Sequence, residues 1–183
     1  IKNKNNLNSH LLKNIPVNGV PEELKKNIFT FEFNDFDRLK YLVETKKVKI
    51  IKMEVRRNYE PKKNFLKKVR NLSNKHKVVL IFDECTSGFR QTLGGLHKLY
   101  NVNPDMVIFG KALGNGYPIN AIIGKKKIMM FAEKTFISST FLSEAIGPAA
   151  ALETIKFMKK NKTYNLILKK GVEVKKKWKS ISI

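Results

Sequence analysis

The chain has 183 residues, of which 42% are hydrophobic, and its formal net charge is +22. This hydrophobic content supports a packed core and excludes wholesale disorder. The apolar runs are too short to span a membrane, and the first residues, IKNKNNLNSH, lack the apolar core of a signal peptide. The single cysteine, Cys85, excludes an internal disulfide and favours a reducing, cytoplasmic location.

The high positive charge has two interpretations. It could mark a surface for nucleic acid or an anionic membrane. However, 32 of the 37 basic residues are Lys, they are spread over the whole chain, and Asn and Ile are also abundant. Lys, Asn and Ile share A/T-rich codons, so a genome biased toward A and T would produce this mixture. Proteins that read a nucleic-acid sequence usually favour Arg over Lys. We therefore expect neither a nucleic-acid partner nor a membrane partner.

Apolar periodicity predicts strands that alternate with helices along the chain. Residues 1–27 are expected to be irregular. The predicted elements are, in order, a helix at 34–45, a strand at 47–55, a helix at 62–76, strands at 77–84, 105–110 and 119–124, a helix at 125–133, and helices at 143–160 and 162–179. Asn34 and Ser143 are the expected N-caps of two of these helices. The alternation predicts an α/β fold, with a mostly parallel sheet flanked by helices.

The strand at 77–84 runs into the motif LIFDECTSGFR, in which two acids follow a continuous apolar run. We expect that run to be buried on both faces. Two chemistries use this pattern. One is the acid pair of transporter-type ATPases, and the other is the carboxylate that pairs with the pyridine nitrogen of pyridoxal phosphate. The ATPase interpretation needs a Gly-rich phosphate loop, which is absent, and the stretch VRNLSNKHK before the strand contains no glycine.

A lysine stands in an unusual setting downstream. Lys111 follows the strand at 105–110 and is the one charged residue between Met106 and Ile123. Charged side chains are normally kept out of such windows unless they are paired or hydrogen-bonded. A lysine amine in an apolar site is also more readily deprotonated, which makes it nucleophilic. Because ligands bind at the carboxyl ends of parallel strands, Asp83 and Lys111 are both candidates for one site.

Three linked motifs carry a resemblance. LIFDECTSGFR, then GGLHKLYNVNPDMVIFGKALGNGYPINAIIG, then TFISSTF resemble the class III, fold-type I aminotransferases that depend on pyridoxal phosphate. The branch that contains glutamate-1-semialdehyde 2,1-aminomutase is the most similar. The resemblance runs from about residue 50 to residue 160, and Lys111 follows Asp83 by 28 positions, a spacing typical of that family.

The resemblance implies roles for individual residues. Lys111 would form the internal aldimine with pyridoxal 5′-phosphate and then move the substrate proton. Asp83 would hold the ring nitrogen protonated, since a paired carboxylate favours the charged form. Thr140 would bind the cofactor phosphate from the neighbouring subunit of a homodimer, and Cys85 would pack against the ring.

Two acids are further candidates for the same site. Glu84 follows Asp83 and is expected to accept structural hydrogen bonds. Glu54 ends the preceding strand, although an ion pair with Arg56 or Arg57 would explain it equally well. The three histidines, His10, His76 and His97, form no metal-ligand spacing, so we expect no metal site and interpret all three as surface or turn residues.

The resemblance covers only part of a family chain. It implies that residues 1–160 form part of the cofactor-binding large domain and that 161–183 form a helix leading toward a small C-terminal domain missing from this sequence. We therefore expect an internal fragment that alone binds pyridoxal phosphate poorly. The expected activity is amino-group transfer on a small amino or carbonyl substrate, with a transaminase of sugar or surface-polysaccharide precursors as an alternative. An ATPase module and a basic nucleic-acid-binding module are the alternatives of another class.

Overall fold

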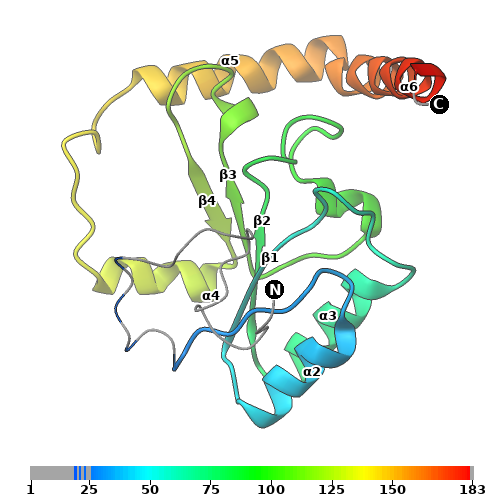
Figure 1. Cartoon of the computed structure of the whole chain (residues 1–183). Helices are drawn as coiled ribbons and strands as arrows, with labels where there is room; N and C mark the ends of the chain where they lie inside the picture. Colours follow the sequence, from blue (N-terminus) through cyan, green and yellow to red (C-terminus); the bar gives the residue numbers. More distant parts are fainter. Residues whose placement is uncertain (1–18, 20, 22, 24–25, 182–183) are drawn as a thin grey trace. The chain divides into compact units, whose positions relative to one another are not determined.

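A computed structural model describes residues 19, 21, 23 and 26–181 of the chain (Figure 1). The expected irregular segment 1–27 lies largely outside these residues, as does His10. The described chain forms two compact units. One unit contains the chain up to Ile51 together with Tyr59–Val79, and the other contains Lys52–Asn58 together with the chain from Leu80 onward. The candidate site lies entirely in the second unit.

The first unit is built on two amphipathic helices, α2 (Phe36–Thr45) and α3 (Phe65–Lys75), which pack against each other. Both confirm predicted helices with shorter bounds. The predicted N-cap Asn34 is wrong, because the Asp35 carboxylate caps α2 by accepting from the Arg38 N–H at 3.0 Å. Asn34 instead bonds Lys62 N–H and the Glu60 carbonyl. The shared core consists of buried apolar side chains from both helices: Leu39, Leu42, Val43, Phe65, Leu66, Val69 and Leu72.

Four strands form one sheet in the order β1-β2-β3-β4. Their bounds are Ile50–Glu54 for β1, Val79–Asp83 for β2, Met106–Phe109 for β3 and Ala121–Gly124 for β4. Strands β2 and β3 are parallel, with Asp83 beside Ile108, whereas β4 runs antiparallel to β3. The predicted α/β class is confirmed. The expectation that β2 is buried on both faces is wrong, because only alternate residues, Leu80 and Phe82, are fully buried.

Helix α5 (Ile146–Asn161) packs on the sheet of the second unit and confirms the predicted helix at 143–160. Its Ala151 is buried with Val107 and Phe109 of β3 and with Leu113. The predicted N-cap Ser143 is wrong, since the Glu144 carboxylate accepts from the first N–H groups of the helix, those of Ile146 and Gly147. This packing holds the end of β3, and with it the residues that follow, in a fixed position.

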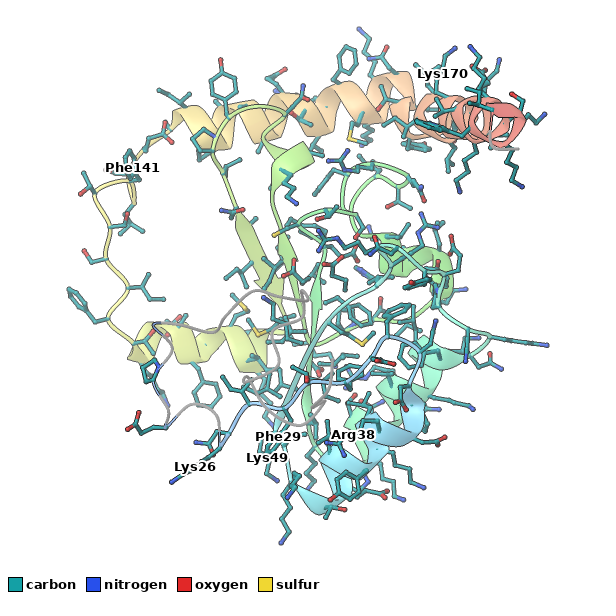
Figure 2. The ribbon with its side chains drawn as sticks, viewed as in Figure 1. Lys26, Phe29, Arg38, Lys49, Phe141 and Lys170 are labelled. Atoms are coloured by element: carbon teal, nitrogen blue, oxygen red, sulfur yellow. The ribbon has the colours of Figure 1, made fainter. Side chains whose placement is uncertain are left out.

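The remaining helices of the second unit are short α4 (Lys126–Met129), continued by a 3-10 helix at Met130–Lys134, and the long α6 (Thr163–Ile181). Figure 1 shows the segment between this 3-10 helix and α5 as an extended stretch, in yellow, without regular structure. Lys170 projects outward from α6, where it pairs with Glu173 at 2.9 Å (Figure 2). Within the described residues, no helix combines the length and apolar character that a membrane crossing requires.

Candidate active site

The candidate site lies at the carboxyl ends of β2 and β3, the edge of a parallel sheet where ligands bind. Asp83 is the last residue of β2 and pairs in register with Ile108 of β3. Lys111 comes three residues after Ile108, just past the end of β3. The parallel register therefore brings the acid and the amine to the same edge, from neighbouring strands. The described hydrogen bonds do not join Asp83 and Lys111 directly.

The Asp83 carboxylate is held between two donors. Lys52 of β1 pairs with Oδ2 at 3.1 Å, and the Cys85 N–H donates to Oδ1 at 3.2 Å. Burial opposes ionisation of this carboxyl group, but the hydrogen bonds from Lys52 and Cys85 outweigh it and lower the pKa of Asp83. Asp83 is thus a carboxylate at neutral pH, the form that can pair with a protonated ring nitrogen.

The Lys111 amine is anchored on the loop that follows β2. Its Nζ donates a hydrogen bond to the Thr86 hydroxyl at 2.9 Å. The Lys111 backbone adopts φ 46°, in the left-handed region that residues with a side chain seldom occupy. Such strain persists where the surrounding structure enforces it, and it is concentrated at functional sites. Sequence reasoning missed Thr86, for which the motif gave no signal beyond its position three residues after Asp83.

Lys111 lines a cavity of about 510 Å³. Arg90 and the segment Tyr117–Asn120 line it as well. A second cavity of about 870 Å³ shares Tyr117–Asn120 and is otherwise lined by residues 139–148, among them Ser139 and Phe141. The site therefore has room for a small molecule beside the amine.

Cys85 lies near both the acid and the amine, since both charges act on its thiol. A Cβ placed on Gly110 would come within 3.4 Å of the Cys85 sulfur, so the backbone before Lys111 passes close to the thiol. Burial raises the pKa of the Cys85 thiol, and the nearby Asp83 carboxylate raises it further. The thiol is therefore protonated and poorly nucleophilic at neutral pH, which favours the expected packing role over a reactive one.

Glu84, the residue after Asp83, is completely buried. Burial opposes its ionisation, yet a hydrogen bond from His97 and backbone donors at Leu96 and His97 lower the pKa of Glu84. The His97 ring Nδ1 lies 2.6 Å from Glu84 Oε1. The expectation that His97 is a surface or turn residue is wrong, because its side chain is buried against this carboxylate. The Gly94-Gly95 pair directly before Leu96 was the available signal of a close approach.

The described hydrogen bonds and ion pairs do not join Glu54 or Thr140 to this cluster. Glu54, the last residue of β1, pairs with Arg57 at 3.2 Å, one of the two partners foreseen. Thr140 is exposed in the extended segment before α5, and its neighbours Ser139 and Phe141 line the larger cavity. Figure 2 shows Phe141 on that segment. No described contact joins Thr140 to Lys111 or Asp83 within this subunit.

The residue types fit pyridoxal phosphate. That cofactor needs an amine to bind its aldehyde and a carboxylate for its ring nitrogen, and here an amine and an ionised carboxylate stand at adjacent strand ends. The strained backbone at Lys111 and the cavity beside its amine agree with this interpretation.

Comparison with known proteins identifies the family. The model of the aminotransferase class-III family matches residues 58–182, so the chain belongs to that family. The prediction of a pyridoxal-phosphate-dependent family is thereby confirmed.

Curated relatives refine this result. The chain is 40% identical over 162 residues to 3-aminobutyryl-CoA aminotransferase of Cloacimonas acidaminovorans, an alignment that covers 84% of this chain and 39% of the relative. It is 35% identical over 165 residues to glutamate-1-semialdehyde 2,1-aminomutase of Citrifermentans bemidjiense, covering 85% and 39%. The chain thus spans about two fifths of the length of these relatives.

Solved structures agree on the fold. Ornithine δ-aminotransferase of Plasmodium falciparum superposes with a TM-score of 0.69 at 25% identity, covering 74% of this chain and 37% of that one. The FumI protein of Sphingopyxis sp. MTA144, solved with pyridoxal phosphate as an internal aldimine, superposes with a TM-score of 0.72 at 22% identity, covering 77% and 36%. The predicted partial fold-type I domain is confirmed.

Proposed function

We propose that this chain supplies the cofactor-binding centre of an enzyme that transfers amino groups with pyridoxal 5′-phosphate. The observation that carries the proposal is the juxtaposition of Asp83 and Lys111 at the ends of adjacent parallel strands, within a class-III chain. In this proposal residues 1–160 belong to the cofactor-binding large domain, and 161–183 lead toward a small C-terminal domain. The single cysteine supports a cytoplasmic location.

Each residue has a proposed role. Lys111 would hold the cofactor through Nζ and would move the proton at the substrate Cα. Asp83 would pair with the ring nitrogen, and Cys85 would pack beside the ring. When bound, pyridoxal phosphate supplies an electron sink that makes the substrate Cα–H acidic.

A second subunit completes the proposed site. The segment before α5 exposes four large apolar side chains, with Phe136 97%, Ile137 62%, Phe141 76% and Leu142 70% exposed. Exposed apolar patches of this kind mark contact surfaces. We propose that this segment packs on a second copy of the chain, so that Thr140 binds the cofactor phosphate of the partner subunit. Glu54 and Glu84 remain the further candidates near the site.

For the substrate we propose only a chemical class. The relatives point to an amino donor and a carbonyl acceptor of the kind that glutamate-1-semialdehyde 2,1-aminomutase and 3-aminobutyryl-CoA aminotransferase handle. A sugar or surface-polysaccharide precursor is the alternative within this class. Glutamate-1-semialdehyde turnover without an external amino acceptor would favour the mutase, whereas a requirement for an acceptor would favour a transaminase. Membership of the class-III family favours all of these over an ATPase or a nucleic-acid-binding module.

Reductive trapping tests the proposal. The full-length protein is mixed with pyridoxal phosphate, reduced with borohydride, digested and analysed by mass spectrometry. We expect the cofactor on the peptide that contains Lys111, and its loss in Lys111→Arg. Lys125→Arg is the matched control, because Lys125 lies on the same chain segment but pairs with Asp105 at 2.7 Å. Trapping at another lysine, or equal trapping in Lys111→Arg, would contradict the proposal.

A further inference from the structure

A fully buried carboxylate closes the loop between β2 and the 3-10 helix at Leu96–Tyr100. Glu84 begins this loop, which we call the 84–97 loop. The Glu84 carboxylate accepts hydrogen bonds from both parts of the loop: the Ser87 hydroxyl at 3.1 Å, the His97 N–H at 3.1 Å, the His97 ring Nδ1 at 2.6 Å and the Leu96 N–H. A buried charge is tolerated only when it is paired and hydrogen-bonded in this way.

The packing of the 84–97 loop leaves little freedom. The Gly88 N–H donates to the Glu84 carbonyl at 2.8 Å, and the Phe89 N–H donates to the Gly94 carbonyl at 2.9 Å. A Cβ added at Gly88 would come within 2.5 Å of the Phe109 ring, and one added at Gly95 would overlap the His97 ring. Side chains and backbone therefore fix the loop against β3.

Thr86 connects this loop to Lys111. It lies two residues after Glu84, directly before Ser87. Its backbone carbonyl and its side-chain hydroxyl both form hydrogen bonds. The Arg90 side chain Nε donates to the Thr86 carbonyl at 2.7 Å, and the Thr86 hydroxyl accepts from Lys111 Nζ at 2.9 Å. The orientation of the Lys111 amine thus depends on a threonine whose position depends on the Glu84 carboxylate.

We propose that the buried Glu84–His97 pair is a positioning pair for Lys111, and that it acts through the Thr86 hydroxyl. The pair touches neither the amine nor the cavity beside it. Its effect is to hold the 84–97 loop so that Thr86 keeps Lys111 Nζ in one orientation. This inference rests on the proposed function, in which that amine captures the aldehyde of pyridoxal phosphate.

A purely structural role makes a different prediction. If the Glu84–His97 pair only stabilised the fold, its loss would slow cofactor capture by Lys111 no more than an equally destabilising substitution elsewhere in the protein. If it acts through Thr86, its effect on Lys111 vanishes once the Thr86 hydroxyl is absent. A double-mutant cycle separates the two, because residues that act in series have non-additive effects.

The experiment follows cofactor capture rather than turnover. The cofactor-free full-length protein is mixed with pyridoxal phosphate, and the rate of capture is followed by absorbance. The variants are His97→Leu, Thr86→Val and the double variant. His97→Asn is the conservative rescue, because its amide nitrogen can replace the Nδ1 donor. Val69→Ala is the matched control, since Val69 is buried in α3 outside the loop.

We expect His97→Leu and Thr86→Val each to slow capture by roughly three- to tenfold, the size expected for losing one hydrogen bond. The double variant should be no slower than Thr86→Val alone, His97→Asn should recover most of the rate, and Val69→Ala should leave it unchanged. Hydrogen exchange in the 84–97 loop should rise in His97→Leu.

Two outcomes would overturn the inference: multiplicative effects in the double variant, or slowing by Val69→Ala equal to that by His97→Leu. If His97→Leu yields no folded protein, Ser87→Ala replaces it in the same cycle, with the same two outcomes. Failure of the wild-type protein to capture pyridoxal phosphate at all would instead contradict the proposed function.

Discussion

Asp83 and Lys111 occupy equivalent places, at or just past the ends of the neighbouring strands β2 and β3, and each has a side-chain partner. Lys52 pairs with Asp83, and Thr86 bonds Lys111. The carboxylate of Asp83 is therefore ionised but already occupied by a cation. A ring nitrogen that pairs with Asp83 would approach a carboxylate whose Oδ2 atom already pairs with Lys52.

Replacing Asp83 tests its role in the chemistry. We expect Asp83→Asn to stay folded, because the amide oxygen can still accept the Cys85 N–H bond and the ion pair with the largely exposed Lys52 contributes little. Activity should fall by about 10²-fold or more, since the ring nitrogen loses the charge that keeps it protonated. The unfolding temperature and the turnover rate of the full-length protein provide the two measurements. Retention of near-normal turnover would remove Asp83 from the site.

Lys52→Met tests the competition at Asp83. The ammonium group of Lys52 has to share or leave the carboxylate when the cofactor binds, so its removal should tighten binding of pyridoxal phosphate. The gain should not exceed about fivefold, because Lys52 is largely exposed and such pairs contribute about 0–1 kcal/mol. Absorbance titration measures the dissociation constant. Weaker binding in Lys52→Met would mean that Lys52 itself helps to hold the cofactor.

At the scale of elements, the 84–97 loop depends on one carboxylate. The pKa of Glu84 is lower in the folded protein than its ordinary value of 4.5. Its contribution to stability is therefore complete above about pH 4.5 and is lost as the pH falls through the folded-state pKa. Acidification through this pKa should loosen the 84–97 loop.

Glu84→Gln tests this dependence. At pH 7 the variant should lose about 3 kcal/mol of unfolding free energy, because a fully buried, multiply bonded carboxylate is replaced by a group that accepts fewer hydrogen bonds. The stability of the variant should also change less between pH 5 and pH 3 than that of the wild type. Urea unfolding of the full-length protein at several pH values measures both. An unchanged pH dependence would show that Glu84 is not ionised when folded.

The sequence predicted the helices and strands more accurately than it predicted the contacts between them. Helices α2, α3 and α5 and strands β2 and β3 follow from local apolar periodicity, which the structure retains. The cap Asp35 was missed because Asn and Asp are equally good N-cap residues by type, and the capping Glu144 was missed because Ser143 is the better N-cap residue by type. The antiparallel direction of β4 is not encoded in its own four residues, since it depends on the turn that precedes it.

The part of the candidate site that lies at the ends of strands was predictable from the sequence. Asp83 and Lys111 come directly after apolar runs, so a parallel sheet necessarily brings them to one edge. Glu84 and His97 are 13 positions apart and meet only because the intervening loop folds back, which no periodicity reports. Thr86 was missed for the same reason, because its relation to Lys111 spans 25 positions.

At the scale of the whole molecule, the proposed homodimer makes a prediction about residues 136–142. Phe141→Glu should shift the full-length protein toward monomer, because it places a charge in an apolar contact surface. Cofactor affinity should fall with it if Thr140 serves the partner subunit. Sedimentation and absorbance titration measure the two effects. Tyr59→Glu is the control, since Tyr59 is 71% exposed and lies outside this segment.

An unchanged dimer in Phe141→Glu would move the interface elsewhere on the molecule. A monomer that binds pyridoxal phosphate as tightly as the wild type would show that the cofactor site is complete within one subunit, and it would remove Thr140 from the proposed phosphate site.

The central claim is that Lys111 and Asp83 bind opposite ends of one cofactor. A crystal structure of the full-length protein with pyridoxal phosphate tests it most directly. We expect continuous density from Lys111 Nζ to the cofactor, and the Asp83 carboxylate within hydrogen-bonding distance of the ring nitrogen. A cofactor bound to another lysine, or a ring nitrogen that faces a group other than Asp83, would contradict the account.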